Sequence, residues 1–170
     1  MKKSKNRLLI KRICFVLSII LMFSLVFTGC GEETESEEKN GTKLSLEGTA
    51  CLAGDTISIP VSLSNNSGIW GAQIFISYDT SVFSFVSCSN GEVFEMCDSN
   101  TDDKGVCILT SQLGVEDTTK NGLVVTVKLK AKDTAEDGEY KITIDEKTNF
   151  SNIAGDLKEV AFAGCTVTVK

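Results

Sequence analysis

The stretch Thr56-Ile57-Ser58-Ile59-Pro60-Val61-Ser62-Leu63 decides the fold class, because every second residue in it is aliphatic. A period of two places the four aliphatic side chains on one face of a β-strand. Pro60 has no backbone N–H to donate to a neighbouring strand. We therefore expect this strand to lie at the edge of a sheet.

The same alternation recurs to the end of the chain, with turn residues such as Asn90-Gly91 and Asp137-Gly138 between the segments. No window has a sustained helical period, and we expect at most a helical turn at 132–136 and at 151–156. Many short strands separated by turns predict an all-β sandwich or jelly roll. We predict nine strands, near residues 43–48, 56–63, 70–78, 82–87, 93–97, 105–112, 122–131, 138–145 and 160–169.

The N-terminal segment 1–29 has the organisation of an export signal. Six cations precede an apolar run at 13–27, and Thr28-Gly29-Cys30 follows it. This order is typical of a bacterial lipoprotein signal peptide, with Cys30 as the lipidated first residue. The alternative is an uncleaved membrane anchor, although the run is shorter than the roughly 18–20 residues that span a bilayer. Both interpretations place the rest of the chain at the extracellular face of the membrane.

Charge separates a spacer from a folded domain. Without the six cations of 1–29, the 17 basic residues fall to 11 against 23 acidic ones, a net charge of −12. Residues 30–42 are acidic and offer no large apolar side chain to a core, so we expect a disordered tether there. The segment 43–170 is long enough for one domain with its own core. Such an acidic chain is not expected to bind nucleic acid, or to contact a membrane other than through its lipid anchor.

The side chains of the domain argue against an enzyme. The chain has no histidine, which excludes His-based triads and makes a metal site improbable, and no cofactor motif is present. The segment 98–102 has the Asp-x-Asn-x-Asp spacing of a calcium loop, but Asp103 replaces the required glycine and Leu109 the final glutamate, so we expect a polar hairpin loop. Five cysteines, Cys51, Cys88, Cys97, Cys107 and Cys165, either include a disulfide or are small buried residues, and spacing does not select a pairing.

Two segments give the chain a resemblance to a known family. The first, 53–61, reads Ala-Gly-Asp-Thr-Ile-Ser-Ile-Pro-Val, and the second, 68–83, reads Gly-Ile-Trp-Gly-Ala-Gln-Ile-Phe-Ile-Ser-Tyr-Asp-Thr-Ser-Val-Phe. Together they resemble the opening of a cohesin domain, and the later strands match in order and length across 43–170. The resemblance implies a nine-stranded jelly-roll sandwich that binds a dockerin, a small calcium-loaded helical module on a partner protein. A lipid anchor, a spacer and one such domain would suit the tethering of a polysaccharide-degrading enzyme at the cell surface, as in a cellulosome.

Alternation locates the expected partner-binding face on the 70–78 and 105–112 strands, with Ala72, Ile74, Ile76 and Tyr78 turned inward. In cohesins two outward positions often carry Asn and Asp, and they correspond here to Gly71 and Gln73. Phe75 is expected to be an apolar anchor, and the alternative is an inward Phe75. The outward residues are Gly71, Gln73 and Phe75 on the first strand and Cys107, Leu109 and Ser111 on the second.

Two other functions remain open from the sequence. Several carbohydrate-binding modules share this fold, but sugar platforms use flat exposed aromatic rings, and Trp70 is the single tryptophan. The other is a surface domain that binds a different protein partner, for example by strand addition at an exposed sheet edge.

Overall fold

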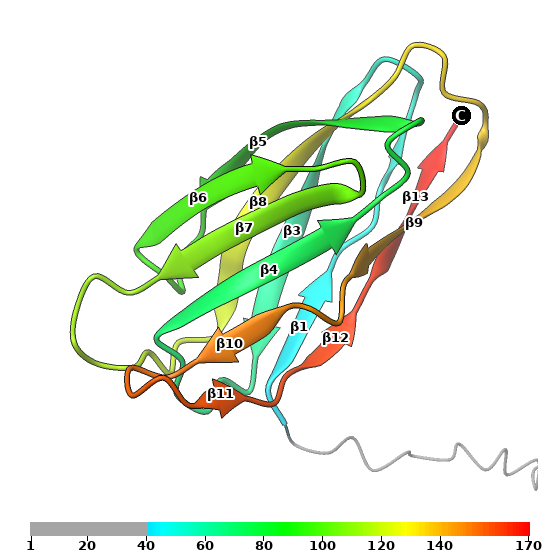
Figure 1. Cartoon of the computed structure of the whole chain (residues 1–170). Coiled ribbons are helices and arrows are strands. Elements are labelled where there is room, and N and C mark those ends of the chain that lie inside the picture. The colour runs from blue at the N-terminus through cyan, green and yellow to red at the C-terminus, as the bar shows by residue number, and fades with distance from the viewer. Residues whose placement is uncertain (1–40) are drawn as a thin grey trace, which may run out of the picture. The chain divides into compact units, whose positions relative to one another are not determined.

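Thirteen strands arranged in two sheets make up the part of the chain that the computed structural model describes, residues 41–170 (Figure 1). The first sheet contains, in spatial order, β12 (Ala161–Ala163), β1 (Lys43–Leu46), β3 (Thr56–Ser64), β8 (Gly122–Ala131) and β5 (Phe83–Asn90). The second contains β11 (Leu157–Lys158), β10 (Asn149–Ser151), β4 (Gly71–Ser77), β9 (Gly138–Ile144), β13 (Cys165–Val169) and β2 (Ala50–Cys51). On the other side of β4 this sheet continues through β7 (Gly105–Ser111) to β6 (Met96–Thr101).

The core lies between the two sheets and is built by the period-two pattern of the strands. In β3 the aliphatic residues are buried while their neighbours reach the surface or its margin. In β4, Ile74 and Ile76 are almost fully buried and meet side chains such as Val127 and Leu129 of β8 in one continuous apolar cluster. Each such side chain contributes about 1.5–3 kcal/mol when buried. The predicted all-β sandwich of jelly-roll type is confirmed.

Pro60 does not mark a sheet edge, so that expectation is wrong. Strand β3 pairs with β1 on one side and with β8 on the other. The carbonyl of Pro60 accepts a hydrogen bond from the Glu47 N–H at 3.2 Å, just beyond the last residue of β1. Because the N and O of one strand residue point to the same side, the missing N–H faces the place where β1 ends. The proline therefore costs one bond at the end of a ladder rather than in its middle.

Each end of the domain supplies a strand to both sheets. The predicted strand 43–48 is β1, which pairs with β3, whereas β2, which runs parallel to β13, lies just beyond it and has no predicted counterpart. The predicted strand 160–169 becomes β12, which runs parallel to β1, and β13, which pairs with β9. Glycines stand at both crossings: a Cβ on Gly48 would lie 2.1 Å from the Thr166 carbonyl oxygen, and one on Gly164 would lie 2.6 Å from that of Ile142. The two crossing segments close one side of the sandwich.

The Tyr78-Asp79 motif that supported the family resemblance has a structural role. Asp79 Oδ1 accepts hydrogen bonds from the backbone N–H and the hydroxyl of Ser81, and the Asp79 carbonyl accepts from Val82 and Phe83. These bonds with Ser81 lower the pKa of the Asp79 carboxyl. The motif thus fixes the turn between β4 and β5, while Tyr78 is buried as its parity predicts.

The remaining differences from the predicted elements are local. Strand β6 covers 96–101 instead of 93–97, and the short strands β10 and β11 have no predicted counterpart. The segments 132–136 and 151–156 hold single hydrogen-bonded turns, Ala135 N–H to Lys132 O at 2.9 Å and Gly155 N–H to Asn152 O at 3.0 Å.

The predicted signal peptide, the lipidation site Cys30 and all but the last two residues of the predicted tether lie outside residues 41–170. Thr42, the last residue assigned to the tether, is buried, and its hydroxyl donates to the Asn65 carbonyl at 2.8 Å. None of the elements in the described range is a helix that could cross a membrane.

Candidate functional site

The six residues predicted to contact a partner come together on the outer surface of β4 and β7. The antiparallel register of these strands sets them opposite one another in three pairs: Gly71 with Ser111, Gln73 with Leu109, and Phe75 with Cys107. Between these positions Ile74, Ile76, Ile108 and Val106 turn into the core. The predicted parity is therefore correct on both strands, and Phe75 is half-buried on the outer surface rather than inside.

Two flanking strands widen this surface, so that two of its rows cross four strands and the row of Phe75 crosses three. On β6, Met96 lies opposite Ser111, Asp98 opposite Leu109 and Asn100 opposite Cys107. On β10, Ser151 lies opposite Gly71 and Asn149 opposite Gln73. We call the outer surface of β10, β4, β7 and β6 the four-strand face. Its central row reads Asn149, Gln73, Leu109 and Asp98.

Sequence reasoning missed the contributions of β6 and β10. The segment 98–102 reads as a loop because Asp, Ser, Asn and Thr are poor strand formers. In the structure Asp98 to Thr101 belong to β6, and the turn follows at 102–104, where Asp102 Oδ1 accepts from the Lys104 and Gly105 N–H groups. The segment is thus largely strand, not the expected hairpin loop, and its side chains do not wrap a central point as calcium ligands do. No group of three or more Asp, Glu, Cys or His within 41–170 is placed to hold a metal ion.

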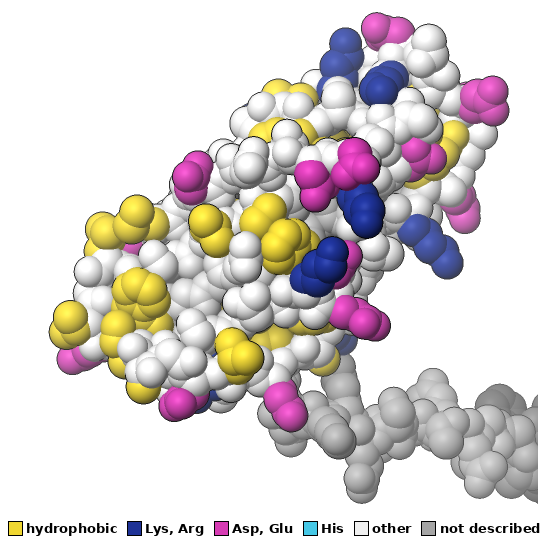
Figure 2. Space-filling view, viewed as in Figure 1, with side chains coloured by type: hydrophobic (Ala, Val, Ile, Leu, Met, Phe, Trp, Pro, Cys, Tyr) yellow, Lys and Arg dark blue, Asp and Glu magenta, His cyan; other side chains and the backbone are white. Residues whose placement is uncertain are grey.

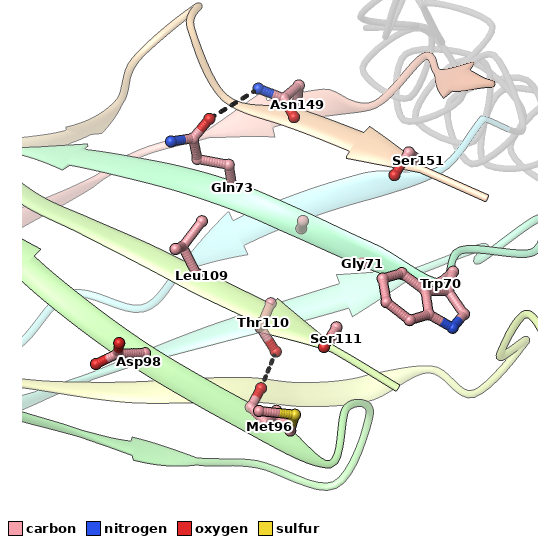
Figure 3. A pocket seen from close by; sticks show the side chains of 11 residues that line it. Trp70, Gly71, Gln73, Met96, Asp98, Leu109, Thr110, Ser111, Asn149 and Ser151 are labelled. Carbon is pink, nitrogen blue, oxygen red and sulfur yellow. Dashed lines mark hydrogen bonds between the residues drawn. The ribbon is translucent and has the colours of Figure 1, made fainter. Parts of the chain in front are cut away.

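A shallow groove of about 440 Å³ lies on the four-strand face (Figure 3). Its floor includes Gly71, which has no side chain to fill it. Gln73 and Asn149 point toward one another along one wall, with Asn149 Nδ2 donating to Gln73 Oε1 at 3.4 Å. Trp70 stands at one end, and its Nε1–H donates to the Gly114 carbonyl at 2.8 Å. The groove therefore combines an aromatic ring, amides and one carboxylate, that of Asp98.

Apolar side chains are concentrated on the four-strand face and beside it. Leu109, in the middle of the face, and Met96, at its β6 side, are each 51% exposed. The loop after β7 adds Leu113 and Val115, and the β10–β11 hairpin adds Ile153 and Leu157 at its margin. Figure 2 shows hydrophobic side chains gathered toward one end of the molecule and most of the visible Lys and Arg side chains toward the other. Such clustering of exposed apolar groups is typical of interaction surfaces.

Hydrogen bonds hold the apolar loops in place. The Leu113 N–H donates to Glu95 Oε2 at 2.8 Å, next to the Trp70–Gly114 bond on the same loop. The Ile153 N–H donates to Asp117 Oδ1 at 2.7 Å, which joins the β10–β11 hairpin to the β7–β8 loop. These bonds reduce the entropy that the loops would lose on binding.

Phe75 lies where the apolar and charged parts of the face meet. Its backbone N–H donates to Thr148 Oγ1 at 3.0 Å, and its carbonyl accepts from the Asp145 N–H at 2.9 Å. The hollow beside its side chain is bordered by Lys104, Lys147 and carboxylates. These two bonds to the 145–148 turn hold the backbone that carries the ring, which favours an anchor role.

These features define a class of protein: a jelly-roll β-sandwich that presents a nearly flat sheet face with an apolar centre and amide groups. The particular family follows from comparison with known proteins. The model of the cohesin domain matches residues 42–169. The chain belongs to the cohesin domain family, whose members are non-catalytic interaction modules.

A curated relative is cellulose-binding protein A of Clostridium cellulovorans, which is 32% identical over 99 residues. The matched segment is 54% of this chain and 5% of that protein, so the relative is very much longer than the chain described here.

Solved structures show the same fold. The OlpA cohesin of Clostridium thermocellum, determined in a cohesin–dockerin complex, has a TM-score of 0.67 at 17% identity and covers 76% of this chain and 99% of that one. The cohesin CaCohA2 of Clostridium acetobutylicum has a TM-score of 0.64 at 20% identity, covering 76% and 92%. A non-cellulosomal cohesin of the archaeon Archaeoglobus fulgidus has a TM-score of 0.66 at 16% identity, covering 76% and 91%.

Proposed function

We propose that this chain binds a dockerin-bearing protein through the four-strand face and holds it at the outside of the cell. The observation that carries the proposal is the register of β10, β4, β7 and β6, which sets all six expected contact residues in adjacent rows around Leu109. Family membership supports a dockerin as the partner.

The shape of the face suits a helical module. A nearly flat sheet accepts the side of a helix, and exposed Leu109 and Met96 offer apolar area that a partner can cover. Phe75 is fixed by its backbone bonds to the 145–148 turn and can act as an aromatic anchor. We therefore assign the main apolar contact to the row of Phe75 and the row of Leu109.

Polar recognition is supplied by neighbouring strands. The outward positions that often carry Asn and Asp in cohesins are Gly71 and Gln73 in this chain. Asn149 of β10 and Asp98 of β6 lie in the same row as Gln73, one on each side of the β4–β7 pair. An amide and a carboxylate are thus present in the row, the amide one strand and the carboxylate two strands away from the family positions on β4. We infer that Asn149 and Asp98 provide the hydrogen-bonding groups that Gly71 does not.

The proposal includes the place of the protein, which is the outer face of the cell membrane. The basic, apolar and small-residue order of 1–30 supports export and lipidation at Cys30, and the acidic spacer would hold the domain away from the membrane. A surface-tethered cohesin would position a polysaccharide-degrading enzyme close to the cell.

Capture of secreted proteins tests the proposal. The full chain, solubilised in mild detergent and immobilised, is exposed to proteins secreted by its source organism, first with Ca²⁺ and then with a chelator. We expect capture with Ca²⁺, release by the chelator, and identification by mass spectrometry of a protein with a duplicated Asp-x-Asn-x-Asp-Gly segment. Phe75→Ala should weaken binding by about 2 kcal/mol or more while the fold is retained.

Direct sugar binding is the competing outcome, because Trp70 lines the groove together with Gln73 and Asn149. If the chain sediments with insoluble cellulose and captures no dockerin-bearing protein, the ligand of the groove is carbohydrate. Loss of that sedimentation in Trp70→Ala would locate the sugar on the four-strand face.

A further inference from the structure

Two cysteine thiols face each other across the sandwich. Cys88 Sγ and Cys97 Sγ are 3.2 Å apart. Cys88 lies on β5 opposite Val127, and Cys97 lies on β6 opposite Thr110. Since both of those neighbours are buried, the two thiols point into the space between the sheets.

The two cysteines lie at the open side of the sandwich, where no chain segment crosses from one sheet to the other as a strand. On the opposite side, β1 continues into β2 and β12 into β13, so two chain segments join the sheets. Here β5 ends one sheet and β6 ends the other. The connection between them, 91–95, buries Val93 and Phe94 and is pinned by the Glu92 N–H bond to the Leu123 carbonyl at 2.8 Å. The two edges are therefore held in register next to the cysteine pair.

We infer that Cys88 and Cys97 form a disulfide that joins the edge strands of the two sheets. The bond length is about 2.05 Å, so the sulfurs must approach by about 1 Å, which side-chain rotation can supply. The oxidant is an external disulfide, either that of a thiol–disulfide oxidoreductase or glutathione disulfide. The inference does not depend on the proposed function, although an oxidising location outside the cell would favour it.

The reaction is two successive thiol–disulfide exchanges. Cys88 loses its proton and attacks one sulfur of the donor disulfide, which breaks that bond and releases one donor thiolate. Cys97 then loses its proton and attacks Cys88 Sγ, and the second donor thiolate leaves as the Cys88–Cys97 bond forms. Two electrons pass to the donor, and the two protons released by the chain are taken up by its two thiolates.

The order of attack follows from the surroundings of the two thiols. Burial, with the hydrogen bond to Cys88 as the second cause, raises the pKa of Cys97 to about 12. A raised pKa disfavours the Cys97 thiolate, so we assign the first attack to Cys88 and the second to Cys97.

The other three cysteines are not placed to compete. Cys107 points outward on β7, where its sulfur accepts a hydrogen bond from Gln73 Nε2 at 3.6 Å. Cys51 lies opposite Val169, four residues along β13 from Cys165. Four residues of strand span about 13 Å, well beyond the roughly 7 Å between Cα atoms that a disulfide allows.

The bond would act on the binding face through β6. Met96 and Asp98, on either side of Cys97, belong to the four-strand face. A covalent link at Cys97 holds this strand to the opposite sheet, so that the outer residues keep their positions when β6 would otherwise separate from β7.

Peptide mapping tests the pairing directly. The full chain, exported by a bacterial host, is equilibrated with oxidised glutathione, alkylated under denaturing conditions and digested with trypsin and chymotrypsin. Cleavage after Phe85, Phe94 and Lys104 isolates Cys88 on 86–94 and Cys97 on 95–104. We expect these two peptides to be linked. Alkylation of both cysteines, or a link from either one to another cysteine, would overturn the inference.

Thermal unfolding supplies an independent readout. By loop-closure entropy for a loop of about ten residues, dithiothreitol should lower the Tm of the wild-type chain by about 10 °C. Cys88→Ser should unfold at the same temperature with and without dithiothreitol. The matched control Cys107→Ser, which removes an outward thiol from the neighbouring strand, should keep the full response. Equal responses of the wild-type and Cys88→Ser chains would contradict the bond.

Discussion

Replacement of Leu109 by alanine measures how much of the four-strand face a partner covers. Leu109 is 51% exposed, so about half of its side chain is available for burial on binding. Complete burial of a leucine side chain is worth about 1.5–3 kcal/mol, which gives about 1 kcal/mol for the exposed half. The expected result is a dissociation constant about fivefold higher.

A charged substitution at the same position should have a larger effect. Leu109 lies opposite Asp98, so Leu109→Asp sets two carboxylates side by side in the centre of the face. Burying this uncompensated charge under a partner should cost about 2 kcal/mol or more, a loss of affinity of about thirtyfold.

The assay is isothermal titration calorimetry with the dockerin-bearing protein obtained by capture. Leu52→Ala is the matched control, because Leu52 is 59% exposed in the loop between β2 and β3, away from the face. We expect its affinity to be unchanged, and both alanine variants should keep their Tm because they remove surface area only. Equal affinities of Leu109→Ala and wild type would refute an interface on the four-strand face. A fall in Tm of more than about 5 °C for Leu109→Ala would instead show that Leu109 supports the fold.

Three further predictions concern the fold and the anchor. Gly105→Ala should lower the free energy of unfolding by about 2 kcal/mol, because its Cβ would lie 2.0 Å from the Ile76 carbonyl oxygen. Denaturant unfolding measures this loss, and an unchanged midpoint would mean that β4 and β7 are farther apart. Asn66→Ala should lower the free energy of unfolding by about 2 kcal/mol in the same experiment, because buried Asn66 Nδ2 donates to the Thr118 and Lys120 carbonyls, each at 2.9 Å. A loss below about 0.5 kcal/mol would show that water replaces these bonds. Cys30→Ser should leave the chain in the medium or as unprocessed precursor when cell fractions are blotted, and normal retention at the membrane would argue against lipidation.

Alternation was sufficient to identify most of the strands and the orientation of Phe75. Ile74 and Ile76 must be covered and Gln73 tolerates water, so one register of β4 is strongly preferred. Where the pattern lacks large apolar residues, as in Asp98 to Thr101, the sequence carries no comparable preference. The strand there forms because β7 offers its unpaired edge to β6. Asp98 was missed as a site residue for this reason, and Asn149 because its strand, β10, is only three residues long, too short for a sustained alternation.

By itself, the sequence determined the sandwich class, the inward and outward faces of β3, β4 and β7, and the family resemblance, because these depend on local periodicity and short motifs. Only the tertiary structure decided that Pro60 lies within a sheet, that the terminal strands cross between sheets at Gly48 and Gly164, and that Cys88 faces Cys97. Each of these depends on which residues distant in the chain become neighbours. That choice is made by the packing of two whole sheets around one core, and no single segment contains it.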